Sequence, residues 1–226
     1  MLSLDTAVNR NRYFMAAESA LPVVVEITWY ERYGKRIFDI VVASFVLVFM
    51  LSWMIPIIGI AIRLSSPGPM LFRQKRSGRH GREFWCLKFR SMYHRPRGHF
   101  AQCEKNDPRV TSIGAFLRRS NLDEMPQFLN VLMGDMSIVG PRPHAVQHDD
   151  RYWFTMPNYH VRYQIRPGIT GLAQVRGARG ETDKFIKMKH RVEYDKLYVR
   201  KQSFLVDIKL CIATIAAMLK GNVNAW

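Results

Sequence analysis

The sequence has few cysteines, and they do not form the pattern of a disulfide framework or a zinc site. Cys86, Cys103 and Cys211 are odd in number and far apart, and no C-x-x-C spacing occurs. The chain also lacks a G-x-x-x-x-G-K-[ST] loop, a G-x-G-x-x-G loop and any internal repeat. These absences exclude a disulfide-stapled domain, a P-loop nucleotidase and a repeat protein, and they favour a reducing compartment.

Acidic residues are also scarce. The chain has 18 Asp and Glu against 34 Lys and Arg, which gives a formal net charge of +16 and a sequence pI near 10.2. Such a charge predicts an anionic partner, either nucleic acid, anionic lipid or a phosphorylated substrate. No helix-turn-helix, RRM or KH pattern is visible, so we expect no nucleic-acid partner. A membrane-tethered basic module that binds nucleic acid or anionic lipid is the rival class.

The chain has enough apolar residues to fold around one substantial core. It has 226 residues, of which 48% are hydrophobic and 12% aromatic. One stretch, "IVVASFVLVFMLSWMIPIIGIAI" from 40 to 62, contains no charge. It is about as long as a bilayer-spanning helix, which needs roughly 20 residues, so we expect membrane insertion. The N-terminus ahead of it does not resemble a cleavable signal peptide.

Basic residues flank this apolar run on both sides, which argues against a simple crossing. Arg32, Lys35 and Arg36 precede it, a larger basic group follows it, and both flanks prefer the cytoplasm. Pro56 lacks an amide donor, and Ser52, one turn earlier, can hydrogen-bond a carbonyl that the break frees. The sequence therefore predicts a helix-break-helix that enters one leaflet and returns. A kinked but ordinary span is the alternative.

Two candidate strands follow, separated by a turn with two glycines. "MLFRQK" and "EFWCLKFR" flank "RSGRHG", which predicts a β-hairpin. The period of two places Trp85, Leu87 and Phe89 on one face of the second strand. Lys88 and Arg90 lie on the other face, where the two cations could bind one anion or form a solvated face over an aromatic core.

Two adjacent acids stand at what the pattern predicts to be the start of a helix. In "SNLDEMPQFLN", Ser120 and Asp123 resemble a capping box, and Gly134 can end the helix. Acids in a first helical turn complement the helix dipole. This simple interpretation would account for Asp123 and Glu124 without any chemistry.

Neighbouring arginines favour a second interpretation of the acids. Arg118 and Arg119 precede them, and Arg142 lies between two prolines that stiffen its backbone. Together these guanidiniums could hold a diphosphate. One carboxylate could then attack phosphorus while its neighbour holds a magnesium ion that also binds phosphate oxygens.

Four long motifs, in this order, resemble those of one protein family. They are "KRIFD", "PGPMLFRQKRSGRHGREFWCLKFRSM", "DPRVTSIGAFLRRSNLDEMPQFLNVLMGDMSIVGPRPH" and "RPGITGLAQVRG". From about Lys35 to the C-terminus the chain resembles the bacterial sugar transferases, also called polyprenyl-phosphate hexose-1-phosphate transferases or monotopic phosphoglycosyl transferases. It looks most like the undecaprenyl-phosphate glucose phosphotransferase branch, and a galactose-1-phosphate branch is the alternative.

The resemblance implies an activity and a set of site residues. Members move a hexose-1-phosphate from a UDP-sugar to undecaprenyl phosphate and release UMP, which starts exopolysaccharide or other surface-glycan synthesis. Asp123 is the implied nucleophile of a covalent aspartyl phosphosugar intermediate, and Glu124 is the implied ligand of Mg2+. The expected phosphate-binding group is Lys88, Arg90, Arg118, Arg142 and Asp195. In this group Arg90 is taken from the strand pattern, and Asp195 is a further acid in "VEYDKLYV".

The resemblance also implies an α+β, monotopic membrane protein with a mostly helical catalytic domain and interfacial amphipathic helices. We expect an N-terminal extension over 1–34, a re-entrant membrane helix over 35–64 that breaks at Ser52 and Pro56, and a catalytic domain over 65–226. The implied location is the bacterial inner membrane, with the catalytic domain on the cytoplasmic face and the lipid bilayer as a partner. A homo-oligomer stays open.

Two further segments have alternative interpretations. "SFLVDIKLCIATIAAML" predicts a helix with Ser203 as its N-cap and an apolar face broken by Asp207, which would lie on the membrane or form an ordinary core helix. His144 and His148 could share a helix face, which would permit a metal site. The family motif accounts for these histidines without one.

Overall fold

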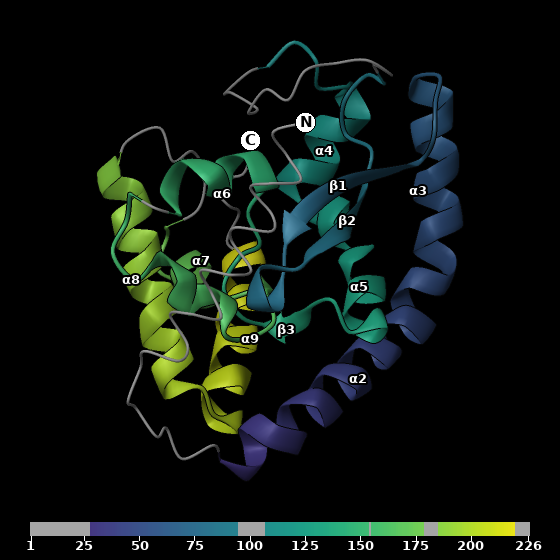
Figure 1. Ribbon diagram of the computed structural model, residues 1–226. Coiled ribbons are helices and arrows are strands. Elements are labelled where there is room, and N and C mark those ends of the chain that lie inside the picture. Colours follow the sequence, from purple (N-terminus) through teal and green to yellow (C-terminus); the bar gives the residue numbers. More distant parts are fainter. Residues whose placement is uncertain (1–27, 95–106, 154, 179–184, 220–226) are drawn as a thin grey trace.

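The computed structural model describes residues 28–94, 107–153, 155–178 and 185–219 (Figure 1). Most of the expected N-terminal extension lies outside these ranges. The helical elements are η1 (Tyr30–Gly34), α2 (Lys35–Val46), η2 (Leu47–Leu51), α3 (Ser52–Ser65), η3 (Arg79–Gly81), α4 (Ser112–Arg119), η4 (Leu122–Glu124), α5 (Gln127–Met133), α6 (Val146–Tyr152), η5 (Tyr159–Tyr163), α7 (Leu172–Val175), α8 (Phe185–Lys201) and α9 (Phe204–Leu219). The strands are β1 (Leu71–Ser77), β2 (Glu83–Phe89), β3 (Ser137–Val139) and β4 (Gly168–Thr170). This mixture of helices and small sheets agrees with the predicted α+β class.

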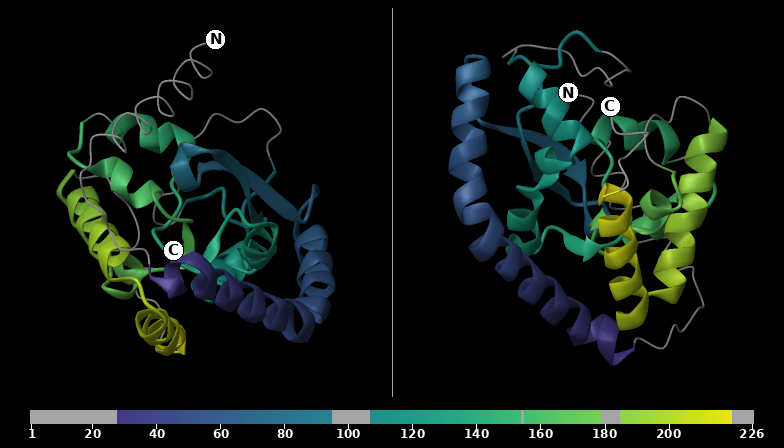
Figure 2. Two further views of the ribbon diagram at one scale, coloured as in Figure 1. Left: turned by 60° about the horizontal axis from the view of Figure 1, so that its bottom comes forward. Right: turned by 180° about the vertical axis from the view of Figure 1, so that it is seen from behind.

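One long helical segment runs along the side of the molecule. It extends from Tyr30 to Ser65 and is long and apolar enough to cross a membrane by length and composition. Its halves, α2 and α3, meet at a bend near η2 and point in different directions (Figures 1 and 2). Ser52 Oγ donates a hydrogen bond to the Val48 carbonyl at 2.7 Å, and Pro56 follows one turn later inside α3. The helix therefore changes direction close to the two residues that the sequence pattern selects.

The predicted hairpin is present, but its buried face differs from the expected one. β1 and β2 pair antiparallel along their whole length. Phe84 and Cys86 are buried, whereas Trp85 is 54% exposed. The expectation of an aromatic core face is wrong for Trp85, because the main core lies on the Cys86 side of the strand, whereas Phe89 on the expected face is buried in a separate cluster with Ile62 and Leu117. Lys88 shares that side and therefore extends from the edge of the core.

The main hydrophobic core lies between the hairpin, the first half of the long helix, α5, β3, α8 and α9. Its buried members are Ala43, Phe84, Cys86, Val131, Met136, Ile138, Val139, Tyr198 and Leu210. β3 and β4 pair in parallel inside this core. The strands approach so closely that a Cβ on Gly168 would lie 2.0 Å from the Gly140 nitrogen. This pairing places the segment after α5 directly against the segment before α7.

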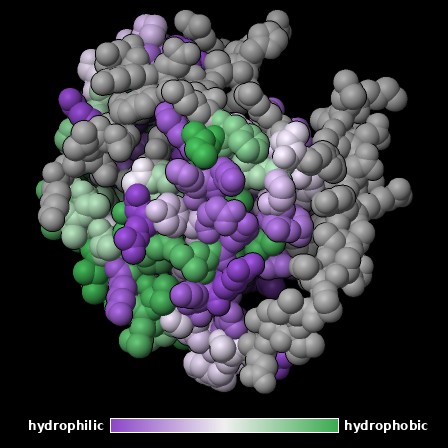
Figure 3. All heavy atoms as spheres, turned by 90° about the vertical axis from the view of Figure 1, so that its left-hand side faces the viewer, coloured by the Kyte–Doolittle hydropathy of each residue, from purple (hydrophilic) through white to green (hydrophobic). Residues whose placement is uncertain are grey.

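A second, aromatic cluster fills the space between α6, η5 and α8. Its members are Tyr152, Trp153, Met156, Tyr159, Tyr163, Met188 and Val192. The outer face of this side of the molecule carries many hydrophilic side chains with hydrophobic groups between them (Figure 3). The long helix lies on the opposite side (Figure 1).

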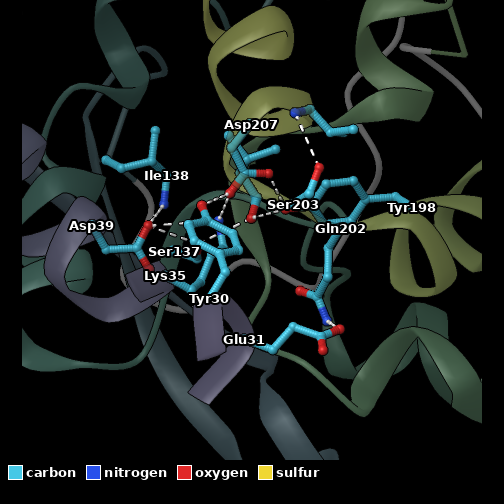
Figure 4. Close-up of polar contacts among 12 residues, drawn as sticks. Tyr30, Glu31, Lys35, Asp39, Ser137, Ile138, Tyr198, Gln202, Ser203 and Asp207 are labelled. Atoms are coloured by element: carbon cyan, nitrogen blue, oxygen red, sulfur yellow. Dashed lines mark hydrogen bonds and ion pairs between the residues drawn. The ribbon is translucent and has the colours of Figure 1, made fainter. Parts of the chain in front are cut away.

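The beginning of the long helix is fastened to the globular part by buried polar contacts (Figure 4). Asp207, in α9, accepts hydrogen bonds from Lys35 Nζ at 2.6 Å and from the Tyr30 hydroxyl at 2.5 Å. Asp39 accepts hydrogen bonds from the Ser137 hydroxyl and the Ile138 amide, each at 2.9 Å. These contacts fix the helix against α9 and β3.

The end of the long helix is fastened in the same way at a different place. Arg90, just after β2, donates to the carbonyls of Ile62, Ser66 and Pro67 at 3.1, 2.6 and 2.7 Å. Carbonyls at a helix C-terminus have no partner within the helix, so a buried guanidinium is a suitable donor. Both ends of the long helix therefore contact one globular domain.

The C-terminal helix begins where the sequence predicts. Ser203 precedes α9 and its hydroxyl accepts a hydrogen bond from the Val206 amide at 3.4 Å. Asp207 is turned inward to the long helix, while Leu205 and Ile212 stay exposed. An ordinary core helix would bury such apolar side chains, so the exposed face favours the membrane alternative.

Candidate active site

The two acids lie in a tight turn between two helices. α4 ends just before them, and Asn121 then adopts a left-handed backbone with φ of 56°. Asp123 and Glu124 occupy η4, ahead of α5. Ser120 donates its hydroxyl hydrogen bond back to the Phe116 carbonyl in α4, so the predicted capping box is wrong. The serine belongs to the end of one helix, and the next helix begins only after the acids.

Glu124 is held by two cations from separate segments. Lys88 Nζ, from β2, donates to Glu124 Oε1 at 2.7 Å. Arg142 Nη1 donates to Oε2 at 3.0 Å, and Arg142 Nη2 donates to Oε1 at 2.5 Å. Burial would raise the pKa of Glu124, but Arg142 and Lys88 outweigh it and hold the pKa well below its usual value. Glu124 is therefore ionised and is bound by cations, which the helix-dipole interpretation does not require.

Asp123 is in a different situation from its neighbour. Its side chain is 8% exposed, and none of the described residues donates a hydrogen bond to its carboxylate. Burial raises the pKa of Asp123; the nearby Lys88 charge lowers it and the Glu124 charge raises it further, with the balance upward. A carboxylate without bound donors keeps its lone pairs available for a substrate.

Arg118 is close to the acids and Arg90 is not. Arg118 Nε donates to the Ser91 hydroxyl at 2.8 Å, and its charge acts to lower the pKa of Asp123. Arg90 is 4% exposed and donates hydrogen bonds to the carbonyls at the end of α3. β2 ends one residue before Arg90, so the alternation that pairs it with Lys88 stops there. Lys88 and Arg90 are therefore not placed to bind one anion together, as the strand pattern predicted.

Asp195 lies behind Arg142, on α8. Its Oδ2 is 3.0 Å from Arg162 Nη2, and the same Nη2 donates to the Arg142 carbonyl at 2.6 Å. Burial raises the pKa of Asp195 to about 6, against the lowering effect of Arg162 and Arg191. Asp195 therefore approaches the site through Arg162, as the counter-ion of a buried guanidinium.

The predicted histidine pair does not share a helix face. His144 precedes α6, whereas the backbone of His148 lies inside it. The His144 ring is buried, and its Nδ1 lies 2.7 Å from the Tyr159 hydroxyl. Across the described ranges, no group of three or more His, Cys, Asp and Glu side chains is placed to hold a metal ion. The shared helix face on which such a metal site would depend is therefore not formed by these two residues.

Sequence reasoning missed three residues near the site. Ser91 accepts the hydrogen bond of Arg118, Asn130 bridges α5 and β2, and Arg162 supports the segment that carries Arg142. For Asn130 there was a signal, because a polar residue on the apolar side of a predicted helix has to find a buried partner. Ser91 and Arg162 lie in segments without periodicity, so only the fold reveals their neighbours.

The geometry places Asp123, whose carboxylate receives no hydrogen bond from the described residues, beside Glu124, which binds two cations. The sequence model of a family described as "Bacterial sugar transferase" matches residues 30–221. The chain belongs to the bacterial sugar transferase family.

Named relatives support the same family. This sugar transferase is 49% identical over 191 residues to the "UDP-glucose:undecaprenyl-phosphate glucose-1-phosphate transferase" of Escherichia coli K12, covering 84% of this chain and 40% of that protein. It is 47% identical over 193 residues to the protein of the same name from Caulobacter vibrioides, covering 85% and 72%. It is 44% identical over 190 residues to the "Exopolysaccharide production protein PSS" of Rhizobium leguminosarum bv. phaseoli, covering 82% and 94%. The chain thus spans less than half of the Escherichia coli relative.

Proposed function

We propose that this sugar transferase moves glucose-1-phosphate from UDP-glucose to undecaprenyl phosphate, releases UMP and so starts the synthesis of an exopolysaccharide or another surface glycan. The observation that carries the proposal is the unequal acid pair. Asp123 has no described hydrogen-bond donor, while Lys88 and Arg142 bind Glu124. The names of relatives at 47% and 49% identity support the choice of substrates.

The proposed chemistry has two displacements at one phosphorus atom. A carboxylate oxygen of Asp123 attacks the phosphorus that carries the sugar, and the bond from that phosphorus to the bridging diphosphate oxygen breaks. UMP leaves with the electron pair. A phosphate oxygen of undecaprenyl phosphate then attacks the same phosphorus, and the Asp123 carboxylate leaves with its own electrons. The two substrates are used in turn, which gives ping-pong kinetics.

The surrounding cations have a defined part in this chemistry. The transferred phosphoryl group spreads negative charge over its oxygens, and prearranged donors stabilise that charge. Arg142 uses two of its donors on Glu124, and its side chain is still partly exposed, so further N–H groups can meet a phosphate. Lys88 binds Glu124 from β2, and the charge of Arg118, at the end of α4, acts on Asp123. These three residues are the proposed phosphate-binding group.

One oxygen of the acid pair would be available to a magnesium ion. Magnesium commonly takes one or two carboxylates plus phosphate oxygens and waters. Glu124 Oε2 receives one hydrogen bond from the described residues, that of Arg142 Nη1, so it keeps a lone pair for a cation. Glu124 would therefore hold the ion. When bound, Mg2+ would neutralise charge on the phosphate oxygens.

The long helix supports a re-entrant, monotopic arrangement. A helix of 36 residues is about 54 Å long, whereas the hydrocarbon core of a bilayer is about 30 Å thick. A straight crossing would separate its ends by the whole membrane. Lys35 near one end contacts Asp207, and Ser66 just past the other contacts Arg90, within the same domain. Both ends would then lie on the cytoplasmic face of the inner membrane, where UDP-glucose is available.

The proposal is tested by UMP release from purified full-length chain with undecaprenyl phosphate. A panel of UDP-sugars is compared, with UDP-galactose as the main competitor, in the presence of Mg2+ and of EDTA. We expect UMP from UDP-glucose with Mg2+, and the highest kcat/KM for that sugar. A higher kcat/KM with UDP-galactose would correct the sugar. Salt-sensitive nucleic-acid binding without turnover of any UDP-sugar would instead favour the rival binding module.

A further inference from the structure

The segment that carries Arg142 has every carbonyl bound from outside. We refer to residues 141–144 as the PRPH loop. Its four carbonyl acceptors and their donors are Pro141 with Gly168 N at 2.9 Å, Arg142 with Arg162 Nη2 at 2.6 Å, Pro143 with Arg76 Nη1 at 2.5 Å, and His144 with Ser77 N at 3.2 Å. Two of the four donors are arginine side chains from elements far apart in sequence.

These four hydrogen bonds hold the backbone that carries the Arg142 side chain in one position. Pro141 and Pro143 fix φ and have no N–H, so the loop cannot order itself through its own amides. Hydrogen bonds from a guanidinium are stronger than those between neutral groups. Arg76 and Arg162 hold the carbonyls of adjacent residues, and the Arg142 side chain then projects to Glu124.

Arg162 is a charged donor in a buried position, where a neutral donor would cost less free energy to bury. Its side chain is 1% exposed, and burial of a guanidinium costs several kcal/mol unless it is paired. Asp195 pairs with it at 3.0 Å, and the Tyr159 hydroxyl accepts from its Nη1 at 3.1 Å. Buried ion pairs add little net stability, so a role in fixing geometry is a better account of this one.

The buried network continues past Arg162 and reaches the loop a second time. The His144 ring contacts Arg162 Nη1 and the Tyr159 hydroxyl, and that hydroxyl donates to Asp149 Oδ1 at 2.6 Å. Tyr163 donates to the same oxygen at 2.5 Å. Arg162 therefore holds both the backbone of one loop residue and the side chain of another.

The contact between Arg142 and Glu124, which the PRPH loop positions, requires a specific geometry. Arg142 meets both oxygens of Glu124 in a two-pronged arrangement, in which the planes of the two groups have to match. A displacement of about 1 Å in such a contact can cost on the order of a hundredfold in rate. The flexible Arg142 side chain alone does not set the position of its own backbone.

We propose that Arg76 and Arg162 are positioning residues for this sugar transferase, which hold the PRPH loop by two adjacent carbonyls and act on catalysis through Arg142. Asp195 serves as the counter-ion that allows Arg162 to be buried there. The inference rests on the proposed function for its kinetic test. Its structural part does not depend on it.

The kinetic test is a pair of double-mutant cycles. Arg142→Lys, Arg162→Lys and Arg76→Met are made alone, and each of the last two is combined with Arg142→Lys. We expect each single change to lower kcat/KM by about tenfold or more, because each moves or weakens the same contact. In the double variants the loss should stay within about twofold of Arg142→Lys alone, since coupled residues are not additive.

Arg90→Lys is the matched control for burial of an arginine that donates to carbonyls. Arg90 contacts the end of α3, so its effect should multiply with that of Arg142→Lys. Multiplicative losses for Arg162→Lys and Arg76→Met as well would overturn the proposal. Wild-type kcat/KM in both single variants would overturn it too. Arg76 is only half-buried, so Arg76→Met keeps the test open even if Arg162→Lys fails to fold.

A second measurement does not require turnover. Hydrogen exchange followed by mass spectrometry reports the mobility of peptides that cover 140–146. We expect faster exchange there in Arg162→Lys and Arg76→Met, with no change there in Arg90→Lys. Unchanged exchange in both test variants would contradict the inference. If wild-type protein released no UMP from any UDP-sugar, the proposed function would fail and this measurement alone would decide the inference.

Discussion

The Asn130 side chain forms a hydrogen bond with the Leu87 backbone, in the place where a neighbouring strand would pair with β2. Asn130 Oδ1, in α5, accepts the Leu87 amide at 2.9 Å, and Asn130 Nδ2 donates to the Trp85 carbonyl at 2.8 Å. One side-chain amide thus satisfies two backbone groups at the open edge of β2. It also fixes α5, which follows the acid pair, against the residue before Lys88.

The first prediction concerns this amide. Asn130→Asp keeps the shape but replaces the donor with an oxygen, so the Trp85 carbonyl loses its partner and faces another acceptor. An unsatisfied buried group costs about 1–3 kcal/mol, and we expect a lower thermal midpoint together with a loss of roughly tenfold or more in kcat/KM. Asn158→Asp makes the same change at an exposed position and serves as the control. Equal kinetics for the two variants would remove Asn130 from the support of the site.

The second prediction concerns the proposed nucleophile. Asp123→Asn removes the charged oxygen, so transfer should fall below detection and no phosphosugar adduct should be trapped. The measurement is UMP release together with mass spectrometry of the peptide that contains residue 123 after brief exposure to UDP-glucose. Asp150→Asn, an exposed acid on α6, is the control. Full activity in Asp123→Asn would return the acids to the helix-dipole interpretation.

The third prediction separates the roles of the two acids. Glu124→Gln leaves Lys88 and Arg142 without their shared counter-charge and weakens the proposed Mg2+ ligand. We expect kcat/KM to fall by about 10- to 100-fold and the Mg2+ concentration for half-maximal rate to rise. A magnesium titration of wild type and variant checks this. An unchanged half-maximal concentration would place the ion elsewhere.

The sequence is sufficient for features that depend on local chemistry. The glycine-bearing turn predicts the hairpin, Ser203 predicts the start of α9, and Gly134 ends α5 with a left-handed φ of 92°. Each of these depends on neighbours within a few residues. The α+β class is an implication of the family resemblance rather than of any one of these local signals.

The features that sequence reasoning missed depend on contacts between distant segments. The buried side of β2 is set by a core that includes α5 and β3, so Trp85 stays exposed in spite of its size. Arg90 donates hydrogen bonds to carbonyls at the end of α3, and the Ser120 hydroxyl donates to a carbonyl of α4. Asp207 interrupts an apolar helix in the sequence, and only the fold reveals Lys35 and Tyr30 as its partners (Figure 4).

The fourth prediction concerns pH and Asp195. Burial raises its pKa in the folded protein to about 6, above the ordinary value near 3.9 in the unfolded chain. Between these values the folded state binds more protons, so the contribution of Asp195 to stability falls as pH rises from about 4 to 6. Asp195→Asn cannot titrate, and the difference in thermal midpoint between wild type and variant should follow this slope. A difference that does not vary with pH would show that Asp195 has an ordinary pKa.

The last prediction concerns the path of the long helix. If both ends lie on the cytoplasmic side, single cysteines at Arg32 and Ser65 should react with a membrane-impermeant maleimide only after the inner face is opened. Both positions are exposed and flank the apolar segment.

Val48→Cys provides the control for burial in lipid, because this exposed side chain lies near the bend and should react slowly from either side. The native cysteines are first replaced by serine, and activity is measured to verify the fold. Labelling of positions 32 and 65 from opposite sides would establish a span and would contradict the re-entrant path. It would also be incompatible with the contacts of Asp207 and Arg90, because one domain cannot bind both ends of a helix across a bilayer.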